Sequence, residues 1–286
     1  MCAVMLEEDQ VVSANVEFYR DIADKYDRYE SCTRDAFAQA MLQDDVQCMA
    51  GKLANRFTQI RCLDCGGGTG NLTLKLLARG WTVTVVDVSS EMLEISKAKV
   101  RAAGFSATFI NQSVEKFLAS ENGQFELVSF SSVLHHIYSP TRVVAKVATR
   151  IVPGGFFYSN FDPVVPSSRL LADSFATFDA VVAKLLFDRK DLLPGVARRL
   201  RKLMLPHDAV HARAIAGPGD LAEYHVREGL DDSAVVEALQ KEDFDVTCLR
   251  YAAGRTKMTR WMNSRLQAAV TFKIMAERKD NHPTNL

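Results

Sequence analysis

Three closely spaced glycines that follow an acidic residue are the part of the sequence best suited to binding a ligand. Gly66, Gly68 and Gly70 occupy alternate positions just after Asp64. Glycine lets a backbone turn sharply and lets a ligand approach it closely. A dinucleotide-binding loop has its third glycine one position later, where this sequence has Asn71. Because a carboxylate beside the loop can hold an ammonium group, the pattern favours a nucleoside that carries an amino acid over a pyrophosphate.

The flanking segments predict that this loop follows a buried strand and opens a helix. Residues 60–63 have the composition of a buried strand, and 72–79 are typical of a helix that ends at Gly80. Cys62 and Cys65 form a C-x-x-C pair, which can serve redox chemistry or bind a metal. Since the glycine loop already occupies the helix start that such a motif uses, we interpret them as small residues at a tight strand end.

A second acidic residue follows the loop at the end of the next predicted strand, 81–88. Asp87 lies about 20 residues beyond the glycines, where a carboxylate can accept both hydroxyls of a ribose. Val88 borders the same position, and a helix then begins with Met92 in its first turn. Met92 could pack on an adenine ring or belong to the core.

The alternation of strands and helices predicts an α/β fold, a doubly wound Rossmann-like sheet that is mostly parallel with an antiparallel last strand. The later strands are expected at 107–110, 125–131, 156–161, 244–251 and 267–277. We predict four parts, which are an N-terminal helical lid (1–55), a Rossmann-like core (56–162), an inserted helical cap (163–228) and the rest of the core (229–286).

The N-terminal segment 14–30 has apolar residues at helical spacing. Tyr19 and Tyr26 are seven positions apart and therefore share a helix face. They either extend a plain core stripe or belong to a lid whose phenols face a bound ligand.

The composition is that of an ordinary globular protein without a dominant charge. The chain has 286 residues, with 35 basic and 35 acidic side chains. No global field therefore favours nucleic acid or a membrane surface. We expect a cytoplasmic protein, because no signal peptide or membrane-spanning run is visible and the six cysteines do not suggest a disulfide framework. A basic run at 198–202 could meet an acidic partner or form a solvated helix face, and the sequence also allows a homodimer.

Several motifs together resemble the class I S-adenosylmethionine-dependent methyltransferases. They are Leu63-Asp64-x-Gly66-x-Gly68-x-Gly70, Asp87, Phe125-Glu126-Leu127-Val128, Leu134-His135-His136 and Val152-Pro153-Gly154-Gly155. The resemblance covers about 16–162 and, more loosely, 230–278, and it is strongest to the small-molecule branch that includes quinone and sugar-amine methyltransferases.

This resemblance implies a set of residues that bind S-adenosylmethionine. The glycine loop would face its methionyl part, with Asp64 near the ammonium, Asp87 on the ribose, Ser113 and Val114 at the adenine, Ser131 beside the sulfonium, and Tyr19 or Tyr26 closing the site. Many relatives carry an aspartate where this chain has Ser113, so that contact is expected to be weaker.

Methyl transfer from a sulfonium is an in-line displacement, which an enzyme accelerates chiefly by positioning. A base is needed only where the acceptor must lose a proton. The candidates are His135 and His136, which follow the fourth strand, and Tyr224 and His225 near the end of the cap. The pair at 207 and 211 could form half of a metal site, but the sequence offers no obvious third ligand, and we predict no metal.

The best-supported function at this stage is methylation of a small-molecule acceptor. The alternatives are a methyltransferase that acts on RNA or protein, and a non-methylating protein of the same fold, such as a binding module or a cyclase. A nicotinamide-dependent dehydrogenase is disfavoured by the position of Asn71.

Overall fold

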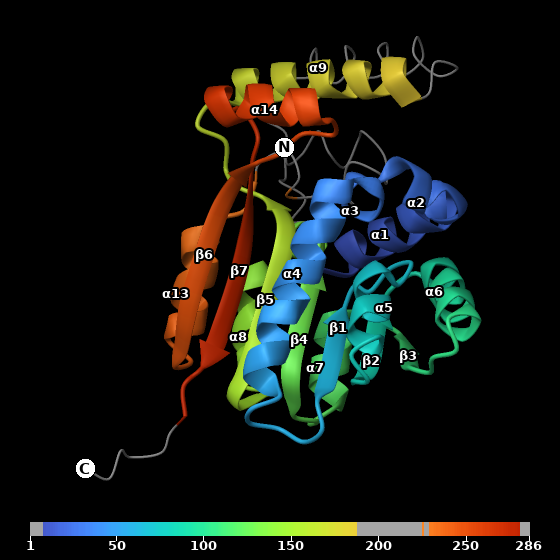
Figure 1. Ribbon diagram of the computed structural model, residues 1–286, viewed down its shortest axis with the longest axis vertical. Coiled ribbons are helices and arrows are strands. Elements are labelled where there is room, and N and C mark those ends of the chain that lie inside the picture. Colours follow the sequence, from blue (N-terminus) through green and yellow to red (C-terminus); the bar gives the residue numbers. More distant parts are fainter. Residues whose placement is uncertain (1–7, 188–224, 226–228, 281–286) are drawn as a thin grey trace, which may run out of the picture.

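The computed structural model describes residues 8–187, 225 and 229–280. Its described strands are β1 (Arg61–Cys65), β2 (Thr82–Asp87), β3 (Thr108–Asn111), β4 (Phe125–Ser131), β5 (Ile151–Pro163), β6 (Phe244–Ala252) and β7 (Val270–Arg278). They form one sheet in the order β3-β2-β1-β4-β5-β7-β6 (Figure 1). Strands β1 to β5 are parallel, and β7 is antiparallel to both of its neighbours. The predicted α/β sheet and its antiparallel last strand are therefore confirmed.

Helices cover both faces of the sheet. Packed on one face are α4 (Ala36–Leu53), α5 (Asn71–Leu77) and α6 (Ser90–Ala102), and on the other α7 (Val114–Ser120), α8 (Pro140–Ala148) and α13 (Asp232–Gln240). The pleat of β2 shows how the sequence serves both layers, because Val83 and Val85 enter the first core and Val86 enters the second. This double burial explains the unbroken β-branched run in that strand.

The strand order reverses at β1, which lies between β2 and β4. Helices that connect the strands on either side leave in opposite directions, and a crevice opens at the carboxyl ends of the strands. The glycine loop follows β1, Asp87 ends β2 and Ser131 ends β4. The topology therefore brings three of the predicted site segments to one edge of the sheet.

The N-terminal region is not one helix over 14–30, as the sequence suggested. It is divided into α1 (Glu8–Ile22), a 3-10 turn (Ala23–Lys25), α2 (Tyr26–Tyr29) and α3 (Ser31–Arg34). The long helix α4 packs on the sheet through Leu42, Val46 and Met49, which are fully buried. Only α1 to α3 therefore lie where a lid would lie, beside α5 and α6 in Figure 1.

The fifth strand begins earlier than predicted. The sequence placed this strand at 156–161, but Ile151 already pairs with Phe125 of β4. A β-bulge absorbs the Pro-Gly-Gly run, and a Cβ on Gly155 would lie 2.9 Å from the carbonyl oxygen of Glu126. Glycine at this position allows the close approach of the two strands.

The inserted segment is described only in part. Helix α9 (Arg169–Phe187) lies beside α14 (Lys257–Leu266), which belongs to the connection between β6 and β7 (Figure 1). Most of the predicted cap lies outside the described residues, together with the basic run at 198–202, the histidines at 207 and 211, and Tyr224. Among the described helices, none combines the length and the apolar character needed to cross a membrane.

Candidate functional site

The glycine loop contains three glycines with a positive φ, which serve two different purposes. At Gly66 a Cβ would lie 2.6 Å from the Val133 side chain, and at Gly70 it would lie 2.5 Å from Ser96 of α6. At Gly68, by contrast, the nearest atom to a Cβ is 3.9 Å away. Gly66 and Gly70 therefore allow close packing within the protein, whereas Gly68 keeps open the space beside the loop.

Asp64, near the end of β1, is hydrogen-bonded to residues of α5 and β4. Its carboxylate is almost completely buried and accepts hydrogen bonds from Thr73 Oγ1 (2.6 Å) and Ser129 Oγ (2.9 Å). Burial raises the pKa of Asp64 to about 6, although both hydroxyl groups oppose the rise. These contacts join β1 to α5 and β4, and the position of Asp64 beside a ligand's ammonium group stays a prediction.

Asp87 joins the end of β2 to the glycine loop. Its Oδ2 accepts the backbone N–H of Gly68 at 2.8 Å, and its Oδ1 accepts the N–H of Ser89 at 2.8 Å. Burial raises the pKa of Asp87, and the backbone N–H groups counteract that rise. Each carboxylate oxygen keeps a lone pair for a further donor, so Asp87 can accept hydroxyl groups from a ligand in this crevice.

A first cavity of about 90 Å³ lies between the loop, the ends of β2 and β4, and helix α1. Most of the predicted cofactor residues line it, namely Tyr19, Tyr26, Gly66, Gly68, Asp87, Val88, Met92, Val114 and Ser131. Asp64, Gly70 and Ser113 do not line it; the Ser113 side chain accepts the N–H of Lys116 and caps α7. The residues that the sequence analysis missed are Asn15, Val86, Gln112, Ser132 and Val133.

The N-terminal helices close over this cavity through polar contacts. Tyr19 Oη lies 2.6 Å from His136 Nε2, and the Tyr19 and Tyr26 rings meet edge to face. Asp27 of α2 accepts a hydrogen bond from Thr69 of the glycine loop at 2.6 Å and pairs with Lys99 of α6. The two tyrosines therefore line the cavity despite the break between α1 and α2, and Asp27 attaches their segment to the core.

Two of the four predicted catalytic residues lie together beside a second cavity. His135 Nδ1 is 2.7 Å from Oδ1 of Asp162, a completely buried residue of β5. Asp162 also accepts the Ser159 hydroxyl at 2.8 Å, which fixes its carboxylate. The His135 and His136 rings are 3.9 Å apart between centroids. His225 donates its backbone N–H to the His135 carbonyl but does not line either cavity.

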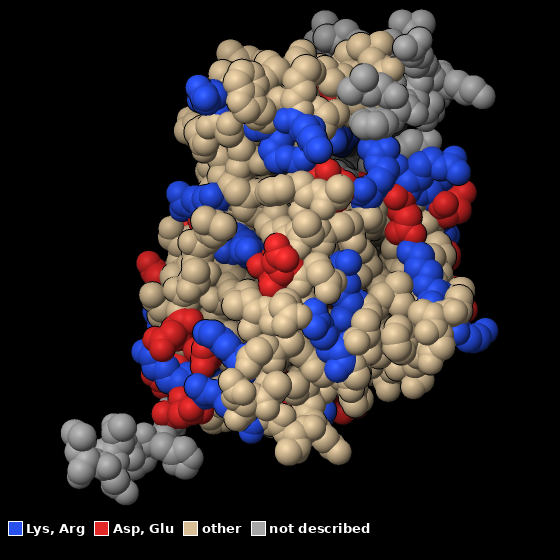
Figure 2. Space-filling view, viewed as in Figure 1, with Lys and Arg blue, Asp and Glu red and all other residues tan. Residues whose placement is uncertain are grey.

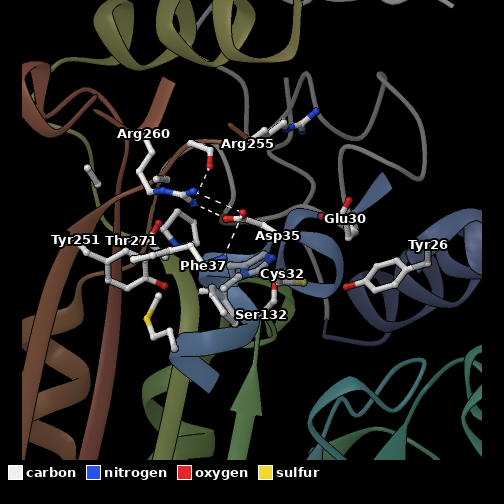
Figure 3. Close-up of a pocket in the computed structure, with 18 of the residues that line it drawn as sticks. Tyr26, Glu30, Cys32, Asp35, Phe37, Ser132, Tyr251, Arg255, Arg260 and Thr271 are labelled. Atoms are coloured by element: carbon white, nitrogen blue, oxygen red, sulfur yellow. Dashed lines mark hydrogen bonds and ion pairs between the residues drawn. The ribbon is translucent and has the colours of Figure 1, made fainter. Parts of the chain in front are cut away.

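The second cavity, of about 290 Å³, adjoins the first through Tyr19, Tyr26, Ser132 and His136, which line both. Aromatic and apolar side chains and two arginines form much of its lining, as Figure 3 shows. These side chains come from α1 to α4, from the ends of β4 and β5, and from the segment between β6 and α14.

Two non-glycine residues in the left-handed backbone region lie at the cavity wall. Ser132, with φ of 63°, directly follows β4. Phe161, with φ of 69°, interrupts the pairing of β5 with β7. The Ser132 N–H donates to the Asn160 carbonyl at 2.8 Å, and the Asn160 side chain accepts the Phe161 N–H at 2.8 Å. Such conformations carry strain and are concentrated at functional sites, so they support the assignment of this cavity as part of the site.

A metal is not indicated by the described residues. No group of three or more His, Cys, Asp or Glu side chains in that part of the chain could hold an ion. Cys62 and Cys65 are buried among apolar side chains, and burial raises the pKa of both thiols well above their ordinary value. They therefore fill space in the core.

Comparison with known proteins agrees with the fold. Residues 62–155 match the family described as a methyltransferase domain. Ubiquinone biosynthesis O-methyltransferases of Escherichia fergusonii and Escherichia coli K12 are 31% identical over 103 residues. Those residues are 36% of this chain and 43% of the relatives, so the alignment spans less than half of each relative.

Solved structures with a similar fold have much lower sequence identity. Magnesium protoporphyrin IX methyltransferase from Synechocystis PCC 6803, with bound S-adenosylhomocysteine, has a TM-score of 0.57 at 13% identity, over 94% of this chain and all of that one. The [4+2]-cyclase SpnF has a TM-score of 0.56 at 12% identity, over 93% and 96% of the two chains. The plantazolicin methyltransferase BpumL has a TM-score of 0.54 at 13% identity, over 96% of both.

The sheet order, the glycine loop and Asp87 define the fold class of the class I S-adenosylmethionine-dependent methyltransferases. Residues 62–155, about a third of this chain, match the methyltransferase domain.

Proposed function

We propose that this protein is a methyltransferase that uses S-adenosylmethionine to methylate a small-molecule acceptor by in-line transfer. The observation that carries the proposal is the pair of adjoining cavities. One is built on the glycine loop and Asp87, and the other contains the His135–Asp162 pair. A donor site that opens into an acceptor site is the arrangement that a positioning enzyme needs.

The described residues fit the cofactor. The open space beside Gly68 allows a ligand to lie against the loop backbone, and Asp87 has free lone pairs for ribose hydroxyls. Met92 and Val114 offer apolar surfaces for the adenine, and Ser131 lines the first cavity next to Ser132, which lines both. When bound, the cofactor supplies an electrophilic methyl group on its sulfonium.

His135 is the residue we assign to proton transfer. The Asp162 carboxylate favours the tautomer with hydrogen on Nδ1, which leaves Nε2 as the ring nitrogen that can accept a proton. Asp162 is thus a positioning residue for His135. His136, whose Nε2 contacts Tyr19, is assigned to the closure of the site. Tyr224 and His225 stay candidates for residues that contact the acceptor. Tyr224 lies outside the described residues, and the His225 backbone N–H donates to the His135 carbonyl.

The size and charge of the site favour a small acceptor over RNA or protein. The second cavity is about 290 Å³, which suits a small organic molecule. On the face in Figure 2, basic and acidic side chains are interspersed, and the whole chain is neutral. Nucleic-acid binding generally needs a basic surface.

The lid and cap, the cellular compartment and the oligomeric state are also proposals. We infer that α1 to α3 and the inserted segment act as lid and cap over the two cavities, because Tyr19, Tyr26 and Asp27 already attach the N-terminal helices there. The five described cysteines form no disulfide, in line with a cytoplasmic setting. A homodimer stays a prediction that sedimentation analysis can test.

A non-methylating protein that binds the same cofactor is the second candidate, because a [4+2]-cyclase has a similar fold. Radiolabelled methyl transfer separates the two. The protein is incubated with methyl-labelled S-adenosylmethionine and panels of phenols, amines, RNA and protein. We expect label in a small phenol or amine, and loss of transfer with retained cofactor binding in His135→Gln. Label in RNA or protein, or tight cofactor binding with no transfer to any panel, would contradict the proposal.

A further inference from the structure

One arginine in the second cavity has hydrogen-bonding capacity that the described protein does not use. We propose that the acceptor combines an aromatic ring with an anionic group such as a carboxylate, and that Arg255 binds that anionic group. This inference rests on the proposed function, since it takes the second cavity as the acceptor site.

The position of Arg255 is fixed by its backbone, while its guanidinium is left available. Its backbone N–H donates to both carboxylate oxygens of Asp179, at 3.0 and 3.2 Å. Asp179 also accepts the Thr259 hydroxyl and forms an ion pair with Arg255, whose Nε is 3.9 Å from Asp179 Oδ2, too far for a hydrogen bond. Within the described residues, the two terminal nitrogens of Arg255 make no hydrogen bond, and 41% of its side chain is exposed. A planar guanidinium with free terminal nitrogens is suited to a carboxylate.

The terminal nitrogens of the other arginine in the cavity already donate hydrogen bonds within the protein. Arg260 forms an ion pair with Asp35, and its guanidinium lies 4.4 Å from the centroid of the Phe37 ring. Figure 3 shows Arg260 directed toward Asp35, while the end of Arg255 points away from Arg260. Arg260 therefore builds the wall of the cavity, and its charge is balanced within the protein.

The remaining wall suits a flat apolar ring. Phe18, Phe37, Met41 and Phe161 line it, and the Tyr251 ring joins them. The Tyr251 hydroxyl donates to Asn160 Oδ1 at 2.6 Å, so its polar end is satisfied within the protein. Aromatic and thioether side chains pack well against an aromatic ligand.

Glu30 also lines this cavity, and its carboxylate would favour a cationic acceptor over an anionic one. It comes from the segment between α2 and α3 and already interacts within the chain. The terminal nitrogens of Arg255 make no hydrogen bond in the described part of the chain. Arg255 therefore offers unused hydrogen-bond donors on a cation, which favours an acceptor with an anionic oxygen.

Three ligands with one phenol ring test this inference by calorimetry. They are 4-hydroxybenzoate, 4-hydroxybenzamide and 4-hydroxybenzylamine, each titrated into the full chain saturated with S-adenosylhomocysteine. We expect the benzoate to bind at least about tenfold more tightly than the amide, as a charge-assisted hydrogen bond implies. Arg255→Gln should abolish that difference and Arg255→Lys should keep part of it. Arg265→Gln, an arginine of α14 that contacts Trp261 and does not line the cavity, is the matched control and should leave it unchanged.

Several results would overturn the inference without affecting the proposed function. They are tightest binding of the amine, equal binding of benzoate and amide, no binding of any of the three, or an unchanged preference in Arg255→Gln. The titration of S-adenosylhomocysteine into the unmodified protein comes first. If that ligand does not bind, the proposed function itself fails, and the inference fails with it.

Discussion

Replacement of Asp64 with asparagine removes a charge that the folded protein buries behind the glycine loop. Asparagine has nearly the same shape, and the hydroxyls of Thr73 and Ser129 can rotate to bond either end of an amide. The substitution therefore changes the charge while it keeps the packing. We expect it to stabilise the protein at neutral pH and to have little effect on stability in acid.

The magnitude follows from the pKa of this carboxyl group. Burial raises it from an ordinary 3.8 to about 6. A rise of about two pH units corresponds to roughly 3 kcal/mol, since each unit is worth about 1.4 kcal/mol. The pKa of Asp64 is higher in the folded protein than in the unfolded protein. The wild type therefore has the full contribution of this carboxyl group to its free energy of unfolding below about pH 4. That contribution is lost progressively as the pH rises through about 6.

The assay is urea unfolding followed by circular dichroism from pH 4 to pH 8, for wild type and Asp64→Asn. The difference between their free energies of unfolding should grow by about 2 to 3 kcal/mol over this range, in favour of the variant. Asp21→Asn, a change at an exposed side chain, is the control and should give a nearly constant difference. A constant or reversed difference for Asp64→Asn would refute the reasoning.

The same variant also tests where Asp64 acts. If its carboxylate held the ammonium group of the cofactor directly, Asp64→Asn would lose much of the affinity for S-adenosylhomocysteine. The contacts place it behind the loop, and we expect affinity within a few-fold of wild type. A loss of a hundredfold or more would return Asp64 to the cofactor contacts.

Two further predictions concern the acceptor side and the lid. Asp162→Asn should lower the rate of methyl transfer about 10²–10⁴-fold where the acceptor must lose a proton, and leave cofactor affinity unchanged, because His135 loses its orienting carboxylate; equal rates in both proteins would argue against the pair. Asp27→Ala removes the contacts with Thr69 and Lys99, so hydrogen exchange in α1 to α3 should accelerate and remain fast when S-adenosylhomocysteine is added. Exchange as slow as in the wild type would show that Asp27 does not hold the lid.

The first cavity could be predicted from the sequence because its residues follow local patterns. A glycine loop after a strand and an acid at the end of the next strand both lie at the carboxyl edge of a parallel sheet. Asp87 and Gly68 were predicted in this way, and a direct hydrogen bond joins them beside the cavity. Asp64 and Ser113 carry the same pattern, but neither lines the cavity. Periodicity and spacing do not distinguish those two cases.

The second cavity could not be predicted because its walls come from segments far apart in the chain. Asp35 and Arg260 form an ion pair across 225 positions, which no local pattern in the sequence indicates. The pairing of Asp162 with His135 depends on β5 continuing to Pro163, whereas the predicted strand ended at residue 161. The left-handed conformations of Ser132 and Phe161 likewise depend on Asn160 of β5. Ser132 contacts it from the end of β4, and Phe161 contacts it as the next residue of β5.

Calorimetric titration of S-adenosylhomocysteine into wild type and Asp87→Ala tests the central claim most directly. We predict that the wild type binds one equivalent, and that Asp87→Ala binds at least about 100-fold more weakly, since it loses charge-assisted hydrogen bonds to the ligand. Glu94→Ala, a change at an exposed acid of α6, should bind like the wild type. Circular dichroism spectra would verify that all three proteins are folded. An undiminished affinity in Asp87→Ala, or no binding by the wild type, would contradict the assignment of this crevice as the cofactor site.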